Sequence, residues 1–132
     1  MKTKKFTLSV LPEKLGICHF AKHAPIPDWA EHNCEFFSLT KTHDELSIVC
    51  PQDHIPENVR AEKDWRAFRL EGPLDMYSVG VIAMLSAPLA KAGISIFNIS
   101  TYKTDYILVE EKNFAKAKKA LGSLCEIKKI NR

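Results

Sequence analysis

The sequence lacks the short motifs that usually identify an enzyme. It has no phosphate-binding Gly-x-x-x-x-Gly-Lys loop, no His-Glu-x-x-His pair and no Gly-x-Ser-x-Gly nucleophile motif. A Cys/His pair such as Cys18 with His43 stays open, because the sequence does not say whether the two side chains meet. These absences favour a protein that is not an enzyme and that needs no cofactor.

The sequence also lacks a long apolar run. The longest lies around residues 79–85, whereas a membrane-spanning helix needs about 20 apolar residues. The basic start Met-Lys-Thr-Lys-Lys is followed only by the short segment Phe6–Leu11, which holds Thr7 and Ser9 and is too polar for a signal peptide. We therefore expect a cytoplasmic protein with no membrane contact.

The sequence also lacks a large excess of one sign of charge. The formal net charge is +3, and several of the positive charges lie in the first five residues and the last few, so the body of the chain is close to neutral. RNA-recognition modules also stack bases on strand aromatics. Of the residues on the expected central strands, only Tyr106 could do so. We expect no nucleic-acid partner.

A complete set of zinc-ligand spacings is missing from the half of the chain that is rich in potential ligands. His19 and His23 have the His-x3-His spacing, but no Cys-x2-Cys pair accompanies them among the candidate ligands of this half: Cys18, His19, His23, His32, Cys34 and Cys50. We predict no metal site. The four cysteines are expected to be reduced, and Cys18 and Cys50 stand in apolar runs where cysteine behaves as a small hydrophobic residue.

The most informative segment that is present runs from Gly93 to Val109. It is typical of two buried strands joined by a short, hydroxyl-rich turn that ends in Asp105. A fainter copy lies sixty positions earlier, where Phe37, Leu39, Thr40, Glu45, Ile48 and Val49 match Phe97, Ile99, Ser100, Asp105, Leu108 and Val109. A period of this size predicts two copies of one supersecondary unit.

The C-terminal half gives the clearer order of elements. Hydrophobic periodicity predicts strands at Trp65–Leu70, Ile94–Ser100, Asp105–Val109 and Cys125–Ile130, with helices following Ser78 and Asn113 as N-caps. Gly93 is expected to end the first helix, and Pro88 is expected to kink its last turn. The resulting β-α-β-β-α-β order defines an α+β, ferredoxin-like unit.

The N-terminal half predicts a shorter, degenerate version of the same unit. Strands are expected at Phe6–Leu11 and Leu15–Ala21, a short helix at Asp28–His32 and a hairpin formed by Phe36–Thr40 and Leu46–Val49. The proline-containing segment 51–60 is typical of a connector. We therefore predict two tandem ferredoxin-like units, at residues 1–60 and 61–132.

A ligand site is predicted where a helix start and the hydroxyl-rich turn come from neighbouring strands. The first amides of a helix suit a carboxylate, and a carboxylate side chain suits an ammonium or guanidinium group. The candidate ligand-binding residues are Asp75, Tyr77, Ser78, Val79, Gly80, Asn98, Ser100, Thr101, Thr104 and Asp105. The alternative is structural: Ser78 only caps a helix, Thr104 and Asp105 only form a turn, and Asn98 satisfies backbone groups at a module interface.

Several of these motifs resemble the ACT-domain superfamily, and in particular small tandem-ACT proteins related to the cytosolic arginine sensors and to aspartate kinase regulatory regions. The resemblance is strongest in Glu71–Asp75, Pro88–Gly93 and Ile94–Tyr106. It extends into the first half through Ala24–Trp29 and Glu45–Pro51.

The resemblance implies amino-acid binding that regulates another protein, without chemistry of its own. In the arginine sensors a threonine and an aspartate of the equivalent turn contact the ligand, and they match Thr101 and Asp105; the loop before the first helix corresponds to Asp75–Gly80. The sensors carry two copies of the tandem, so a homodimer of this chain would restore four units. The alternative is a dimerisation or protein-interaction module that binds no small molecule.

Overall fold

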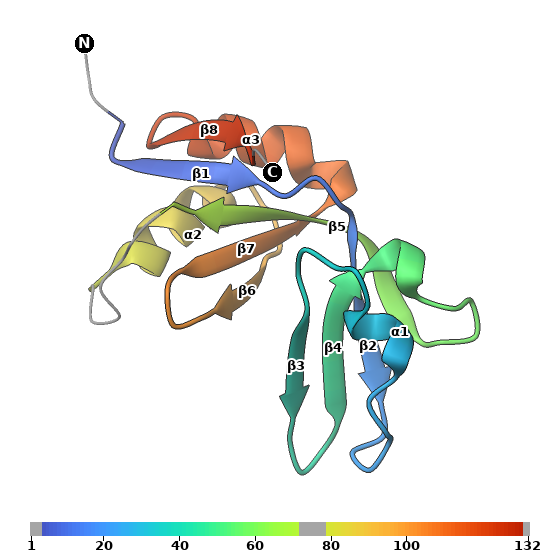
Figure 1. Ribbon diagram of the computed structural model, residues 1–132. Helices are drawn as coiled ribbons and strands as arrows, with labels where there is room; N and C mark the ends of the chain where they lie inside the picture. The colour runs from blue at the N-terminus through green and yellow to red at the C-terminus, as the bar shows by residue number, and fades with distance from the viewer. Residues whose placement is uncertain (1–3, 72–78, 131–132) are drawn as a thin grey trace. The chain divides into compact units, whose positions relative to one another are not determined.

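The computed structural model describes residues 4–71 and 79–130 of the chain. These residues form two compact units: unit 1 consists of Met1–Pro12 and Arg66–Arg132, and unit 2 of Glu13–Trp65 (Figure 1). The long strand β5 (Ala61–Leu70) contributes its first residues to unit 2 and its last residues to unit 1. It begins four residues before the strand predicted at Trp65.

Unit 1 is an α+β unit with a mixed sheet and two helices, as predicted. After β5 come α2 (Val81–Lys91), β6 (Phe97–Ser100), β7 (Asp105–Glu110), the 3₁₀ turn η2 (Glu111–Asn113), α3 (Phe114–Leu121) and β8 (Cys125–Lys129). This sequence of elements is the expected β-α-β-β-α-β order. The sheet also contains β1 (Phe6–Val10), and its strand order is β6-β7-β5-β1-β8.

The position of β1 does not follow from the order of elements. This strand comes from the start of the chain but lies between β5 and β8. It pairs antiparallel with β5, where Leu8 faces Leu70, and parallel with β8, where Phe6 faces Cys125. The boundary predicted at residue 60 groups β1 with the N-terminal half of the sequence, whereas its hydrogen bonds are made with strands of the C-terminal half.

The core of unit 1 lies between the sheet and its two helices. Alternate strand residues point to this face, because successive side chains of a strand point to opposite sides. The helices contribute residues four apart. The buried core comprises Leu8, Val10, Phe68, Leu70, Leu85, Leu89, Ile94, Ile107, Val109, Ala117, Leu121 and Cys125. Burial of each large aliphatic or aromatic side chain stabilises the fold by about 1.5 to 3 kcal/mol.

Helix α2 continues past Pro88 and ends at Lys91, with Ala92 as its C-cap and Gly93 next, in the closing position predicted for that glycine. Gly93 has a φ of 75°, and its N–H donates to the carbonyl of Ala90. The N–H of Ile94 donates to the carbonyl of Leu89 at 3.0 Å, and both side chains belong to the core. This paired arrangement satisfies the last carbonyls of the helix and aims the chain into β6.

Unit 2 consists of a four-stranded antiparallel sheet and a short helix. Its elements are β2 (Leu15–Phe20), α1 (Asp28–Glu31), β3 (Ser38–Lys41), β4 (Leu46–Pro51), the 3₁₀ turn η1 (Gln52–His54) and the start of β5. The strand order is β3-β4-β2-β5. Its core includes Cys18, Ala30, Leu46, Ile48, Cys50 and Ile55.

The two hairpins repeat the same turn, but with a shift of one residue from the sequence echo. The N–H of Thr42 donates to the carbonyl of Glu45 at 2.9 Å, and the N–H of Thr101 donates to that of Thr104 at 2.8 Å. The last ladder pairs are Lys41 with Leu46 in unit 2 and Ser100 with Asp105 in unit 1. Residue 46, rather than Glu45, is therefore the structural counterpart of Asp105.

Replacing Gly93 tests the end of α2. A Cβ at this position meets no heavy atom within 4 Å, so the cost of Gly93→Ala is purely conformational. We expect a loss of about 1 kcal/mol in the free energy of unfolding, measured by chemical denaturation. The control is Gly93→Asn, which should lose less because asparagine tolerates positive φ; equal losses for both variants would contradict this account.

Thiol reactivity tests the packing of the cysteines. Cys18, Cys50 and Cys125 are buried and Cys34 is half-buried. Burial raises the pKa of Cys125 to about 11, which suppresses its reactive thiolate. A colourimetric thiol reagent at neutral pH should modify Cys34 first and the other three only after unfolding. Cys34→Ser should abolish the early reaction, and rapid labelling of a buried thiol would contradict the structure.

Candidate functional site

The start of α2 lies two residues later than a cap at Ser78 predicts. Gly80 is the N-cap, and its φ of 79° is incompatible with a right-handed helix, so the helix begins at Val81. The N–H of Met84 makes the first intrahelical hydrogen bond, to the carbonyl of Gly80 at 3.0 Å. The helix start therefore offers the amides of residues 81–83, and Val79 before it is 95% exposed. Asp75, Tyr77 and Ser78 lie outside the described residues.

The turn between β6 and β7 is held by its two threonines. The Thr101 hydroxyl accepts the N–H of Thr104 at 3.2 Å and donates to its carbonyl at 3.1 Å. The buried hydroxyl of Thr104 donates to the carbonyl of Leu70 at 2.5 Å. The end of β5 is thus fixed beside the turn, at the end of unit 1 where α2 begins (Figure 1).

Three of the predicted residues form a hydrogen-bonded chain. The amide of Asn98 donates to Ser100 Oγ at 3.3 Å, and the Ser100 hydroxyl donates to Asp105 Oδ1. The register pairs Ser100 with Asp105 and Asn98 with Ile107, which is a core residue, so all three polar side chains lie on the helix-covered face of the sheet. Asn98 and Ser100 are exposed and Asp105 is half-buried.

The exposure of Asn98 differs from the sequence expectation of a buried strand residue. It lies on β6, which pairs only with β7 among the described strands and so forms an edge of the sheet. Asn98 therefore has no need to satisfy groups in a dry core.

This arrangement gives unit 1 a carboxylate acceptor at the β6–β7 turn and unpaired amides at the α2 start. The serine hydroxyl uses one of the roughly four acceptor positions of an ionised carboxylate, which leaves Asp105 able to accept from a cationic group. The amides at the α2 start carry partial positive charge that suits a carboxylate. Of the predicted residues, Thr104 has a structural role, because its hydroxyl bonds to the Leu70 carbonyl. Asn98, Ser100 and Asp105 form one accessible polar cluster.

The equivalent turn of unit 2 has no carboxylate at the position of Asp105. The counterpart of Asp105 is Leu46, which is 1% exposed and part of the unit 2 core. Glu45 precedes it, and its carboxylate lies 3.9 Å from Nε2 of His19. The two turns therefore share a backbone but not their polar chemistry.

No three His, Cys, Asp or Glu side chains in the described ranges are grouped so as to hold a metal ion. Within residues 4–71 and 79–130, no helix has the length and apolar character required to cross a bilayer.

Two protein-family models match the chain, one in each half. A family model described as an ACT domain matches residues 60–123, and a model of an N-terminal domain matches residues 13–58. The human protein named cytosolic arginine sensor for mTORC1 subunit 1 is 38% identical over 101 residues, which cover 70% of this chain and 28% of that protein. The chain thus spans little more than a quarter of this relative.

Solved structures with the same fold include one of high similarity over nearly the whole chain. The X-ray structure of protein Atu0741 from Agobacterium tumefaciens has a TM-score of 0.89 and 32% identity, covering 98% of this chain and 97% of that one. The ligand-free regulatory subunit of aspartate kinase from Thermus thermophilus has a TM-score of 0.58 and 11% identity, covering 85% and 93%. At that identity the second likeness concerns the fold alone.

The fold and these similarities define a regulatory-type α+β protein built from ACT-like units. Residues 60–123 belong to the ACT-domain family; the chain is related in sequence to the arginine sensors and shares its fold with aspartate kinase regulatory domains.

Replacing Thr104 tests whether its hydroxyl holds the site together. Thr104→Val keeps the shape but leaves the buried Leu70 carbonyl without its 2.5 Å hydrogen bond. We expect a loss of about 1 to 3 kcal/mol in the free energy of unfolding, measured by urea denaturation. Thr104→Ser retains the hydroxyl and should lose less; a valine variant as stable as the wild type would refute the assigned role.

Proposed function

We propose that this chain is a non-enzymatic sensor that binds a free amino acid between the start of α2 and the β6–β7 turn. The observation that carries the proposal is the polar chain from Asn98 through Ser100 to Asp105, which ends in a half-buried carboxylate. Thr101 closes the same turn and completes its hydroxyl-rich rim.

Two parts of the site recognise the two ends of the ligand. Asp105 accepts a charge-assisted hydrogen bond from an ammonium or guanidinium group, and Ser100 fixes the orientation of its carboxylate. The ligand carboxylate rests on the amides at the α2 start, where Gly80 lacks a side chain and has no heavy atom within 4 Å of a virtual Cβ. The loop residues Asp75, Tyr77 and Ser78 complete the proposed site.

Arginine is the first ligand to test because the human relative is named as an arginine sensor. The chemistry of Asp105 equally suits the α-ammonium group that every free amino acid carries. The proposal therefore concerns amino acids as a class, and the side chain selected is a question for experiment.

The proposal includes a cytoplasmic homodimer that regulates another protein. Among the described strands, β6 and β8 form the edges of the unit 1 sheet and β3 forms an edge of the unit 2 sheet. Edge strands present unpaired backbone groups that a second copy of the chain can cover.

A thermal-shift panel with the twenty standard amino acids tests the function directly. A ligand at a hundred times its dissociation constant stabilises the native state by about 2.7 kcal/mol, which gives a measurable rise in Tm. Asp105→Asn should weaken binding of the responding amino acid by about 1.5 to 3 kcal/mol in calorimetric titration.

The matched control is Asp44→Asn. This variant removes the same charge from the equivalent turn of unit 2, where Asp44 is exposed. It should bind like the wild type. A wild-type chain that responds to no amino acid would contradict the proposal, as would an Asp105→Asn variant that binds normally.

A further inference from the structure

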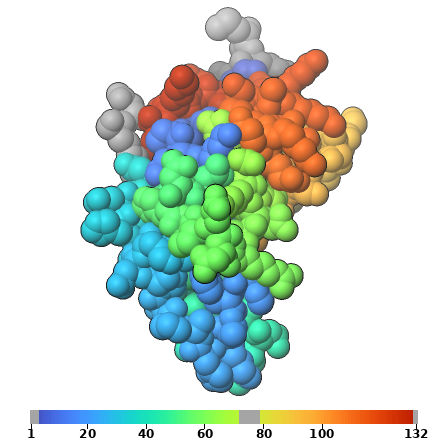
Figure 2. Space-filling model, turned by 90° about the vertical axis from the view of Figure 1, so that its right-hand side faces the viewer, coloured from blue at the N-terminus to red at the C-terminus, as the bar shows by residue number. Residues whose placement is uncertain are grey.

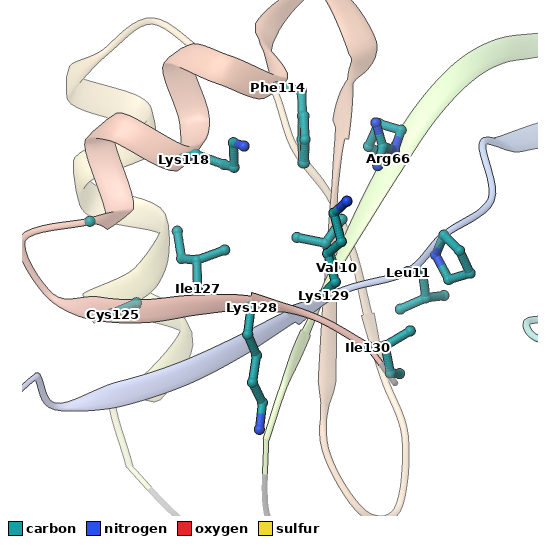
Figure 3. A pocket seen from close by; sticks show the side chains of 12 residues that line it. Val10, Leu11, Arg66, Phe114, Lys118, Cys125, Ile127, Lys128, Lys129 and Ile130 are labelled. Carbon is teal, nitrogen blue, oxygen red and sulfur yellow. The ribbon is translucent and has the colours of Figure 1, made fainter. Parts of the chain in front are cut away.

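Unit 1 contains a concave site far along the sheet from β6. It is an open groove of about 690 Å³ between α3 and the strands β1 and β8 (Figure 3). Its volume falls within the range of small-molecule sites in proteins. The groove is lined by Val10, Leu11, Pro12, Arg66, Phe114, Lys118, Gly122, Cys125, Ile127, Lys128, Lys129 and Ile130, all of which belong to unit 1.

The floor of the groove is apolar. Val10 comes from β1, Ile127 from β8 and Phe114 from the start of α3, and Figure 3 shows these side chains facing the same space. The ring of Phe114 stacks on that of the buried Phe68, with centroids 5.4 Å apart. This contact fixes the aromatic wall of the groove. Helix α3 itself lies on the surface of unit 1, where it is drawn in orange in Figure 2.

The rim of the groove is cationic. Arg66 from β5, Lys118 from α3 and Lys129 from β8 contribute positive charge from three different elements. The register places Lys129 on the same face of β8 as Cys125 and Ile127, whereas the side chain of Lys128 points away (Figure 3). No acidic residue occurs among the described residues that line the groove.

Arg66 is held in place with part of its hydrogen-bonding capacity unused. Its Nη1 donates to Glu111 Oε2 at 3.1 Å, and its guanidinium lies 4.2 Å from the centre of the Phe114 ring. Its Nε is buried and has no hydrogen-bond partner among the described residues. A buried N–H of a charged group without a partner is costly, so this edge of the guanidinium suits an incoming carboxylate.

We propose that this groove binds a small amphipathic carboxylate, with its acid group among Arg66, Lys118 and Lys129 and its apolar body against Phe114, Val10 and Ile127. An amino acid is a poor occupant, because its ammonium group meets three cations and the neighbouring carboxylate of Glu111 is already paired with Arg66. A neutral apolar molecule leaves the buried Nε of Arg66 unpaired. The site is separate from the one proposed around Asp105.

The first experiment compares probes that differ only in their head group. Decanoate, decanol and decyltrimethylammonium, each below its micellar concentration, are titrated into the full chain and followed by amide NMR. Decanoate should bind at least tenfold more tightly than the other two, and its shift changes should cluster at residues 10–12, 66 and 114–130. A parallel titration with 3-phenylpropanoate distinguishes an aromatic from an aliphatic body.

The second experiment removes charge from the groove and, separately, from elsewhere on α3. The double variant Lys118→Gln, Lys129→Gln should weaken decanoate binding roughly three- to tenfold. The control Lys116→Gln, Lys119→Gln removes two exposed charges of the same helix that do not line the groove, and it should bind like the wild type. Asp105→Asn should also retain decanoate binding, which separates this site from the amino-acid site.

Several results would overturn the proposal. Equal affinity for decanoate and decanol would show that the cations play no part. Equal weakening by the groove and control variants would indicate nonspecific attraction to a basic helix. Shift changes outside the groove, or the absence of binding by both carboxylates to the folded chain, would also reject the assignment.

Discussion

Strand β1 holds the C-terminal sheet together, because it is the sole described partner of β8 and also pairs with β5. Its inward residues Leu8 and Val10 belong to the core of unit 1. Its buried Ser9, on the opposite face, donates to the carboxylate of Glu71 directly after β5. Without β1, β8 would have no ladder partner and the floor beneath α3 would lose Val10. The last strand of the chain therefore depends on the first.

The two ends of this sheet carry opposite chemistry. Near β6, the exposed polar residues lead to the carboxylate of Asp105. Near β8, the polar residues are cations above an apolar floor. The core between these ends is continuous, since α2 and α3 both pack residues such as Leu85 and Leu121 into it. Both sets of polar residues thus lie on the helix-covered face of the sheet, on either side of this core.

Local patterns predicted the elements of unit 1 well, because each reports a property of neighbouring residues. The helical spacing of Leu85 and Leu89, the left-handed Gly93 and the Thr101–Thr104 turn all follow from short-range rules. The pairing partners of the strands do not follow from such short-range rules. The apolar run at Phe6 predicts a strand but cannot say which sheet it joins, and parallel pairing with β8 brings together residues more than a hundred positions apart.

The predicted site shows the same difference between local patterns, which the sequence reveals, and long-range pairing, which it does not. Sequence reasoning placed Ser100 and Asp105 in one turn but aligned the repeat by side-chain type, which matched Asp105 to Glu45. The hydrogen bonds of Thr42 and Thr101 instead match it to the buried Leu46. A shift of one residue moves a strand side chain to the opposite face, so the acid of unit 2 cannot take the same role.

The groove beneath α3 was missed for a related reason: Arg66, Phe114 and Lys129 lie on three separate elements and converge only when β1 is in place. The two places also differ in charge, since the β6–β7 turn carries the carboxylate of Asp105 whereas the groove is lined by Arg66, Lys118 and Lys129.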